Sequence, residues 1–246
     1  IKYGMLNNND FYEKVKDIVI FPSSNGKATT IPEYLERNKD KTKNTVLYCS
    51  DKEGQTAYIN ICKEQGLEVI YQNTIIDSHF LQFLETKDSN IKYSSVDTSL
   101  TDYLVDKEKD KGKEVTEPAE NKAAKEKITD IFKKALNNDK LIIKVENLKT
   151  GKIPAVIMES ETAKRMKTMS MLFSGPKMPA FEDLTLVVNN TSPIIKKIVT
   201  MKAQGSNNKK VDALCGYVYD LAIMSQHQLT GDQMQAFLDR AYELLL

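Results

Sequence analysis

Hydrophobic and polar positions in the first hundred residues follow two alternating patterns. A helical period carries Phe11, Val15, Ile18 and Val19. Thr30-Ile31-Pro32-Glu33 has the form of a capping box with a proline in the first turn of a helix. Continuous apolar runs then alternate with amphipathic stretches, in the order 45–49, 53–65, 67–71, 76–84 and 91–95. Because strands and helices alternate with short connections, we predict a small three-layer α/β subdomain with a parallel sheet.

The second half of the chain has a different predicted order. Its elements are a helix from about residue 119, strands at 141–145 and 155–158, a helix over 160–173, a strand at 184–188 and helices from 192 onward. The first two strands are joined through a turn signal at Thr150-Gly151, which predicts a hairpin with a long loop. This half is therefore predicted to be an α+β domain with a three-stranded sheet and a C-terminal helix pair.

A stretch of balanced positive and negative charge separates the two halves. It begins at Asp106 and contains Gly112 and Pro118, a composition typical of a solvated spacer. We therefore expect a domain at 1–105, a charged linker at 106–118 and a second domain at 119–246. The chain begins with Ile1 in a pattern typical of the middle of an element, so we expect a fragment whose partner domains are missing.

Composition limits the partners that the chain can attract. The net charge is +1, with 28% charged and 41% hydrophobic residues, which is ordinary for a globular protein and gives no general attraction to nucleic acid or anionic membranes. No apolar run approaches the roughly 18 residues that a membrane-spanning helix needs, and the first residues lack the order of a signal peptide. We therefore expect no nucleic acid or membrane partner and a cytoplasmic location.

Cysteine and histidine give little sign of metal or redox chemistry. Cys49, Cys62 and Cys215 are scattered and form no CxxC pair, so we expect them to be reduced and buried. His79 and His227 are the only histidines, and a zinc site would need nearly all of these residues to converge. We expect no metal site, and we interpret both histidines as solvated or partly exposed surface residues.

The turn at 50–55 is the one candidate for phosphate chemistry. It joins a predicted strand to a helix, which is where nucleotide-binding α/β folds hold phosphate. The turn has a single glycine, Gly54, and the carboxylates of Asp51 and Glu53 would repel an anion, so Asp51 is better explained as a helix cap. No sequence motif names a catalytic residue, and we expect none. A nucleotide-binding or phosphate-binding enzyme domain is kept as the alternative function.

Methionines gather in and around the predicted helix at 160–173. Five of them lie within a short stretch: Met158, Met166, Met169, Met171 and Met178. On the helix, Met166, Met169 and Phe173 share one face, and Leu172 widens it. Such a stripe is either part of a core or an adaptable surface, because the flexible thioether packs against many partner shapes.

The last two predicted helices carry more apolar residues than a single chain would cover. One has a stripe of Val211, Leu214, Cys215, Val218, Leu221 and Ala222, and the other has Met234, Phe237, Leu238, Ala241 and Leu245. Exposed apolar surface of this kind usually marks an interface, and twofold dimers are the commonest assembly. We therefore expect a homodimer whose interface contains Leu214, Val218, Leu221, Phe237, Leu238, Ala241 and Leu245.

Several segments, in order and spacing, resemble a known family. They are 1–6, 11–17, 50–55 and 66–71 in the first half and Ile153-Pro154-Ala155-Val156, Ala163-Lys164-Arg165-Met166, 171–173 and Leu184-Thr185-Leu186-Val187-Val188-Asn189 in the second. The chain resembles the heat-shock protein 90 molecular chaperones in their bacterial form. The similarity spans the end of the family's middle domain and its C-terminal dimerisation domain.

The resemblance implies a non-catalytic piece of an ATP-dependent chaperone. It implies homodimerisation through the last two helices and client binding by Met166, Met169, Leu172 and Phe173. It also implies that ATP and magnesium bind a domain outside this chain, so no cofactor is expected here. The expected partners are a second copy of the chain and unfolded client proteins.

Overall fold

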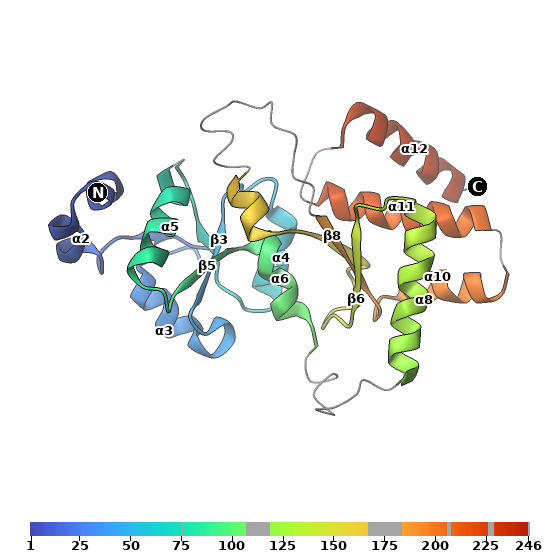
Figure 1. Cartoon of the computed structure of the whole chain (residues 1–246), viewed down its shortest axis with the longest axis horizontal. Coiled ribbons are helices and arrows are strands. Elements are labelled where there is room, and N and C mark those ends of the chain that lie inside the picture. The colour runs from blue at the N-terminus through green and yellow to red at the C-terminus, as the bar shows by residue number, and fades with distance from the viewer. Residues whose placement is uncertain (75, 107–118, 167–183, 206–207, 226–228, 246) are drawn as a thin grey trace. The chain divides into compact units, whose positions relative to one another are not determined.

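The computed structural model describes residues 1–74, 76–106, 119–166, 184–205, 208–225 and 229–245. The contacts divide the chain into two compact units (Figure 1). The first contains Ile1–Leu100 together with residues 161–166, and the second contains the described residues of 101–160 and 184–245. Each unit has its own hydrophobic core.

The first unit is built around three parallel strands. Its helices are α1 (Lys2–Asn7), α2 (Asn9–Val15), α3 (Ile31–Thr42), α4 (Thr56–Glu64) and α5 (Ile76–Lys87), with residues 161–166 also helical. The helix α6 (Val96–Leu104) begins in this unit, and its residues from Thr101 onward belong to the second. Its strands are the short pair β1 (Phe21–Pro22) and β2 (Ala28–Thr29) and the parallel strands β3 (Thr45–Cys49), β4 (Ile70–Tyr71) and β5 (Lys92–Ser95). The strand order β4-β3-β5 confirms the predicted parallel α/β arrangement.

The order of the strands explains why β3 is the most apolar of them. It lies between β4 and β5, and four of its five residues are buried. The connection to β4 runs through α4 and the connection to β5 through α5. The first connection leads from β3 to β4, and the second leads from β4 back past β3 to β5. Since the two connections run across the sheet in opposite directions, right-handed crossovers place these helices on opposite faces of the sheet, and Figure 1 shows helices on both sides.

The second unit combines a mixed sheet with four helices in its described part. The elements are α8 (Ala119–Leu136), β6 (Ile142–Glu146), β7 (Ala155–Glu159), β8 (Leu184–Asn189), α10 (Pro193–Ala203), α11 (Asn208–Met224) and α12 (Gly231–Leu245). The strand order is β6-β8-β7, with β8 parallel to β6 and antiparallel to β7. The predicted three strands and C-terminal helices are therefore present.

The predicted hairpin between the first two strands of this unit is wrong. The third strand, β8, lies between them, because its last four residues are buried and its apolar run suits the centre of the sheet. Asn189 at its end is fully buried and holds the loop that joins β6 to β7. Its side-chain amide donates to the carbonyl oxygens of Thr150 and Ile153, each at 2.7 Å, and its oxygen accepts from the Leu148 N–H at 3.2 Å.

Local signals in the sequence were reliable at several helix ends. Thr30 and Glu33 form the predicted capping box at α3, and Thr230 and Gln233 exchange the same two hydrogen bonds at α12. Gly66 ends the segment after α4 with a φ of +64°, a conformation that side chains with a Cβ rarely adopt. The three cysteines are buried and free, as predicted.

Two local predictions need correction. The helical face expected at 11–19 is displaced, because α2 ends at Val15, Phe11 is 37% exposed and Tyr12 is buried in its place. Asp51 does not cap α4, which begins at Thr56 with Gln55 at its N-cap. The Asp51 carboxylate accepts instead from the N–H groups of Glu53 and Gly54 in the preceding turn.

Two segments pack differently from the predicted division at residues 105 and 119. Residues 101–106 join the second unit, where the Lys149 N–H donates to the Leu104 carbonyl at 2.8 Å and Val105 pairs with Leu148. Residues 161–166 join the first unit through ion pairs described below. Of the predicted linker, 107–118 lie outside the described residues, and the domain boundaries themselves stay a prediction.

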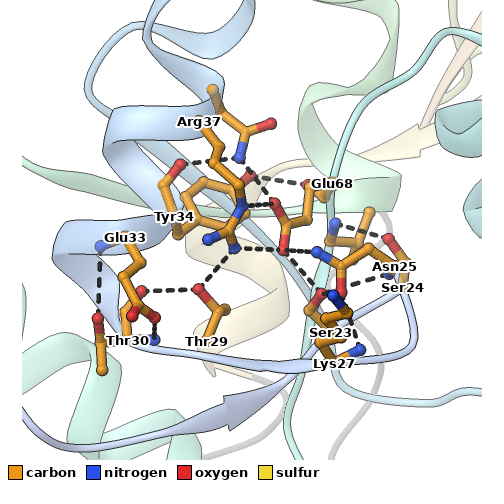
Figure 2. Close-up of polar contacts among 12 residues, drawn as sticks. Ser23, Ser24, Asn25, Lys27, Thr29, Thr30, Glu33, Tyr34, Arg37 and Glu68 are labelled. Atoms are coloured by element: carbon orange, nitrogen blue, oxygen red, sulfur yellow. Dashed lines mark hydrogen bonds and ion pairs between the residues drawn. The ribbon is translucent and has the colours of Figure 1, made fainter.

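A buried carboxylate fixes the loop between β1 and β2 on α3 (Figure 2). Glu68 accepts from Ser23 at 2.7 Å, Asn25 at 2.8 Å, Asn38 at 3.0 Å and the Arg37 guanidinium at 2.9 Å. Burial alone would raise the pKa of Glu68, and these donors outweigh it and hold the pKa below its ordinary value. Each of these partners lies within the first unit, so Glu68 organises one end of its sheet.

Candidate functional site

The helix at 161–166, which carries the first of the predicted client-binding residues, is anchored on the first unit by a buried ion pair. Lys164 Nζ lies 2.5 and 2.6 Å from the two carboxylate oxygens of Asp97, and it donates to Ser95 Oγ at 2.6 Å. Gln55 donates to the same carboxylate at 2.6 Å. Burial would raise the pKa of Asp97, but Lys164 and the hydrogen bonds together lower it, so the carboxylate is charged.

Glu161 makes a second anchor one turn earlier. Its carboxylate accepts from the Tyr48 hydroxyl at 2.6 Å, from the Thr98 hydroxyl at 2.8 Å and from the Ser95 N–H at 3.1 Å. These partners come from β3, β5 and α6. The helix is therefore held at the carboxyl ends of the neighbouring strands β3 and β5.

Arg165 completes the anchored face of this helix. Its guanidinium donates to Glu85 at 2.8 Å, to Glu161 at 3.1 Å and to the Tyr93 carbonyl at 3.1 Å. Positions 161, 164 and 165 share one side of a helix, so Met166 falls on another side. Met166 is 50% exposed, which makes it available to a partner. Met169, Leu172 and Phe173 lie outside the described residues, as do Met171 and Met178.

The turn at 50–55 does not have the geometry of a phosphate loop. Four of its backbone N–H groups are already bonded to side chains, those of Glu53 and Gly54 to the Asp51 carboxylate and those of Ser50 and Asp51 to Gln55 Oε1. A ligand of an open α/β sheet normally lies in the crevice at the carboxyl ends of the strands. In this chain the Lys164 side chain extends there toward Ser95. The alternative of a nucleotide site in this unit has no support in this geometry.

A cavity of about 250 Å³ lies beside Met166 within the first unit. One wall is formed by α5, with Ser78, His79 and Gln82, and the other by residues of the 161–166 helix. His79 is half-buried, as expected for a partly exposed histidine. Asp77 is not its partner, because this buried carboxylate accepts from the Asn73 and Thr74 N–H groups and pairs with Lys2.

The C-terminal helices present the second candidate surface, which we call the α11/α12 surface. It consists of the exposed apolar residues of both helices, namely Leu221, Met224, Met234, Leu238, Tyr242 and Leu245. No residue of α12 is buried. A groove of about 770 Å³ runs between α8, α11 and α12. The single chain therefore covers α12 on one side only.

An aromatic stack and an ion pair join α12 to α11. The rings of Tyr217 and Phe237 stack with centroids 5.1 Å apart, and Arg240 donates to Asp220 at 2.5 and 2.8 Å. Burial raises the pKa of Asp220 even though Arg240 opposes the shift. A Cβ at Gly216 would lie 2.9 Å from Arg240 Cδ, so the small residue leaves room for the arginine stem.

The predicted interface residues do not all lie on this surface. Leu221, Leu238 and Leu245 are exposed by 40%, 36% and 83%. Phe237 and Ala241 are half-buried beside them. Leu214 is half-buried against the core of its own unit, and Val218 lies inside that core with 2% exposure, so Val218 offers no surface to a partner.

Sequence patterns missed the polar residues that anchor the 161–166 helix. Gln55, Asp97 and Lys164 gave no signal, because Asp97 and Lys164 are 67 positions apart and meet only in the fold. The spacing of Glu161, Lys164 and Arg165 was visible as a polar face beside the methionines. It could have predicted that the helix has one polar face and one apolar face, but not what the polar face binds.

The described residues contain neither a metal-binding group nor a membrane-spanning helix. No three His, Cys, Asp or Glu side chains among them are grouped closely enough to hold a metal ion. None of the described helices has both the length and the apolar content needed to cross a membrane.

Comparison with known proteins identifies the family. The Hsp90 protein family matches residues 1–246, the whole chain. Chaperone protein HtpG of Bacteroides thetaiotaomicron is 31% identical over 211 residues, which are 81% of this chain and 30% of the relative. HtpG of Bacteroides fragilis is 30% identical over the same shares, and HtpG of Chlorobium chlorochromatii is 24% identical over 100% of this chain and 38% of the relative.

The chain belongs to the Hsp90 protein family, as the resemblance in its sequence predicted. Its named relatives are bacterial HtpG chaperones. The chain spans 30 to 38% of the length of these relatives.

Proposed function

We propose that this chain pairs two copies of a bacterial Hsp90-type chaperone and holds unfolded client segments. The proposal rests on the family and on two exposed apolar features, the α11/α12 surface and Met166. Chaperone activity of the longer protein, and the binding of ATP and magnesium by a domain outside this chain, are part of the same proposal. The cytoplasm is the proposed location.

The observation that carries the dimer is the exposed face of α12. Met234, Leu238 and Leu245 recur at helical spacing and are exposed by 37%, 36% and 83%. Apolar residues arranged in this way on an amphipathic helix usually meet a partner. A second copy offers the same surface, so a twofold pairing of α11 and α12 would cover both.

Leu238→Asp tests the dimer, because it places a charge at the centre of the exposed face. We expect the variant to sediment as a monomer at concentrations where the unaltered chain is a dimer. Gln233→Glu is the matched control, since it adds the same charge to α12 and keeps the hydrogen bond with Thr230 that the capping box needs. An unchanged dimer in Leu238→Asp would disprove this interface.

The observation that supports client binding is the position of Met166. The anchored face of its helix is occupied by ion pairs, while the methionine side chain is half exposed. A methionine held on a rigid support combines a fixed position with an adaptable side chain. We propose that it continues into a client surface with Met169, Leu172 and Phe173.

Met166→Ser tests this surface with a fluorescently labelled, reduced and carboxymethylated α-lactalbumin, which stays unfolded. We expect binding to weaken about fivefold, and Met169→Ser with Phe173→Ser to weaken it further. Ile142→Ser is the control, because Ile142 in the second unit is 52% exposed and equally apolar. If Ile142→Ser weakens binding as much as Met166→Ser does, any exposed apolar residue contributes to client binding. If Met166→Ser leaves binding unaltered, Met166 has only a structural role.

A further inference from the structure

The loop between β1 and β2 contains Asn25-Gly26, the one Asn-Gly pair in the chain. Asparagine is a chemically labile residue, because the main-chain nitrogen of the next residue can attack its side-chain amide carbon. Glycine hinders this attack least, since it has no Cβ beside the nitrogen. Gly26 is exposed and Asn25 is half-buried, so water reaches the pair. The loop is therefore a candidate site of chemical modification.

In the folded first unit the Asn25 side chain is held at both ends of its amide (Figure 2). Its Nδ2 donates to Glu68 Oε1 at 2.8 Å. Its Oδ1 accepts from the Lys27 N–H at 2.9 Å and lies 2.8 Å from the Ser23 hydroxyl, which it shares with Glu68. Since attack on the amide carbon makes that carbon tetrahedral and expels Nδ2, the reaction must give up these hydrogen bonds.

The attacking nitrogen is held as well. The Gly26 N–H donates to the Ser23 carbonyl at 3.2 Å, and the φ of +83° at Gly26 belongs to the same turn. The nitrogen becomes a nucleophile only when it loses its proton, and that loss breaks the hydrogen bond to Ser23. The folded loop therefore opposes both halves of the reaction, and an open loop opposes neither.

The product of the reaction does not fit the place of the asparagine. Deamidation converts the amide that donates to Glu68 into a carboxylate, which has no proton to donate. Two like charges would then lie at the distance of the present hydrogen bond, beside a carboxylate that is 9% exposed. The Arg37 guanidinium balances the single charge of Glu68, and it cannot balance two. The modified loop is therefore repelled from Glu68.

We infer that Asn25 is a conformation-dependent modification site, which deamidates when the loop leaves Glu68 and then prevents the loop from closing again. The Gly26 nitrogen loses its proton and bonds to the Asn25 side-chain carbon, the bond from that carbon to Nδ2 breaks, and ammonia leaves with the proton. Water then opens the cyclic imide at either carbonyl and gives aspartate or isoaspartate. The inference does not depend on the proposed chaperone function.

The first test follows the deamidation of Asn25 by mass spectrometry of the peptide that contains it, during incubation at neutral pH. We expect the folded chain to react about tenfold more slowly, or slower still, than a synthetic peptide of residues 21–29, because the reaction must wait for local opening. Isoaspartate should form together with aspartate. Equal rates in the chain and the peptide, or aspartate as the sole product, would overturn the inference.

The second test loosens the loop. Ser23→Ala removes the hydroxyl shared by Asn25 and Glu68 and leaves the ion pair of Glu68 with Arg37 in place, so we expect about threefold or more faster deamidation. Ser78→Ala is the matched control, because this half-buried serine of the same unit bonds to Gln72. Both variants are incubated well below their thermal midpoints. An unchanged rate in Ser23→Ala, or equal acceleration in Ser78→Ala, would show that the Glu68 contacts do not control the reaction.

The third test concerns the effect of the product and uses Asn25→Asp, which has the same side chain. Its thermal midpoint at pH 7 should lie about 3 °C or more below that of the unaltered chain. Because each carboxylate raises the pKa of the other, the difference should shrink as the pH falls toward 4 and one of them takes up a proton. Asn44→Asp adds the same charge at an exposed position of this unit and should change the midpoint by less than about 1 °C. Equal midpoints for the two variants would disprove the repulsion from Glu68.

Discussion

The carboxylate of Asp97 and the ammonium of Lys164 carry opposite charges where little water reaches them. Their side chains are 9% and 13% exposed, and Gln55 and Ser95 satisfy further hydrogen bonds of the pair. A buried ion pair contributes little compared with well-packed apolar residues, but removing one partner is strongly destabilising. The pair therefore acts mainly by specifying where the 161–166 helix lies within the first unit.

Asp97→Asn removes the carboxylate from a buried ammonium and should destabilise the first unit by about 3 kcal/mol at pH 7. Because the pKa of Asp97 in the folded protein lies below its ordinary value of 3.8, the stabilisation is complete above about pH 4 and is lost as the pH falls through the folded pKa. The difference between Asp97→Asn and the unaltered chain should therefore shrink toward pH 3 in urea unfolding.

The control for this prediction is Asp40→Asn, which removes an exposed carboxylate from α3 of the same unit. It should change stability by less than about 0.5 kcal/mol at either pH. A difference for Asp97→Asn that stays constant between pH 7 and pH 3 would contradict the electrostatic explanation. The loss would then come from hydrogen bonds that an asparagine cannot reproduce.

At the scale of elements, α12 packs on α11 through an aromatic stack and a buried carboxylate paired with Arg240. Burial raises the pKa of Asp220, so the attraction to Arg240 offsets only part of the free-energy cost of burying this carboxylate. The stacked rings of Tyr217 and Phe237 supply the apolar part of the contact. The helix is therefore held in place but remains open to a partner on its exposed face.

Arg240→Met should destabilise the docking of α12 by about 3 kcal/mol, because it leaves the buried Asp220 carboxylate without this guanidinium. Adding Asp220→Leu should restore most of that loss, since the buried charge is then gone. Hydrogen exchange of the α12 amides measures the effect on this element alone. If the two single variants and the double variant show additive effects, the two side chains are not coupled.

Elements were predictable where their signal is local. The capping boxes at Thr30 and Thr230, the positive φ at Gly66 and the apolar run of β3 are all set by residues within a few positions of one another. The parallel α/β order followed from those elements. The hairpin failed because pairing of β8 between β6 and β7 is a non-local choice that neither strand encodes by itself.

The candidate site shows the same limit. Met166 was visible in the sequence because its stripe has helical spacing. Its exposure depends on partners far along the chain, since Glu161 binds Tyr48 at a separation of 113 residues. The interface prediction for Val218 meets the same limit, because the α11 stripe mixes residues that face the core with residues that face outward. Periodicity defines a face of a helix but does not say what covers it.

At the scale of the whole molecule, a dimer would carry two copies of the client surface. A long unfolded chain could then bind both copies, and the second contact would form at a high effective concentration. A short probe with a single segment would gain nothing from the second copy. Dimerisation should therefore strengthen the binding of long clients selectively.

Comparing a dimer with a monomer that has intact client residues tests this selectivity. Leu238→Asp should weaken the binding of unfolded α-lactalbumin by about tenfold or more, while the affinity for a short peptide with a single apolar segment should stay the same. Gln233→Glu should leave both affinities unchanged, because the dimer remains. If Leu238→Asp lowers both affinities equally, the substitution has disturbed the client surface itself. If it lowers neither, each protomer binds clients alone and pairing does not assist client binding.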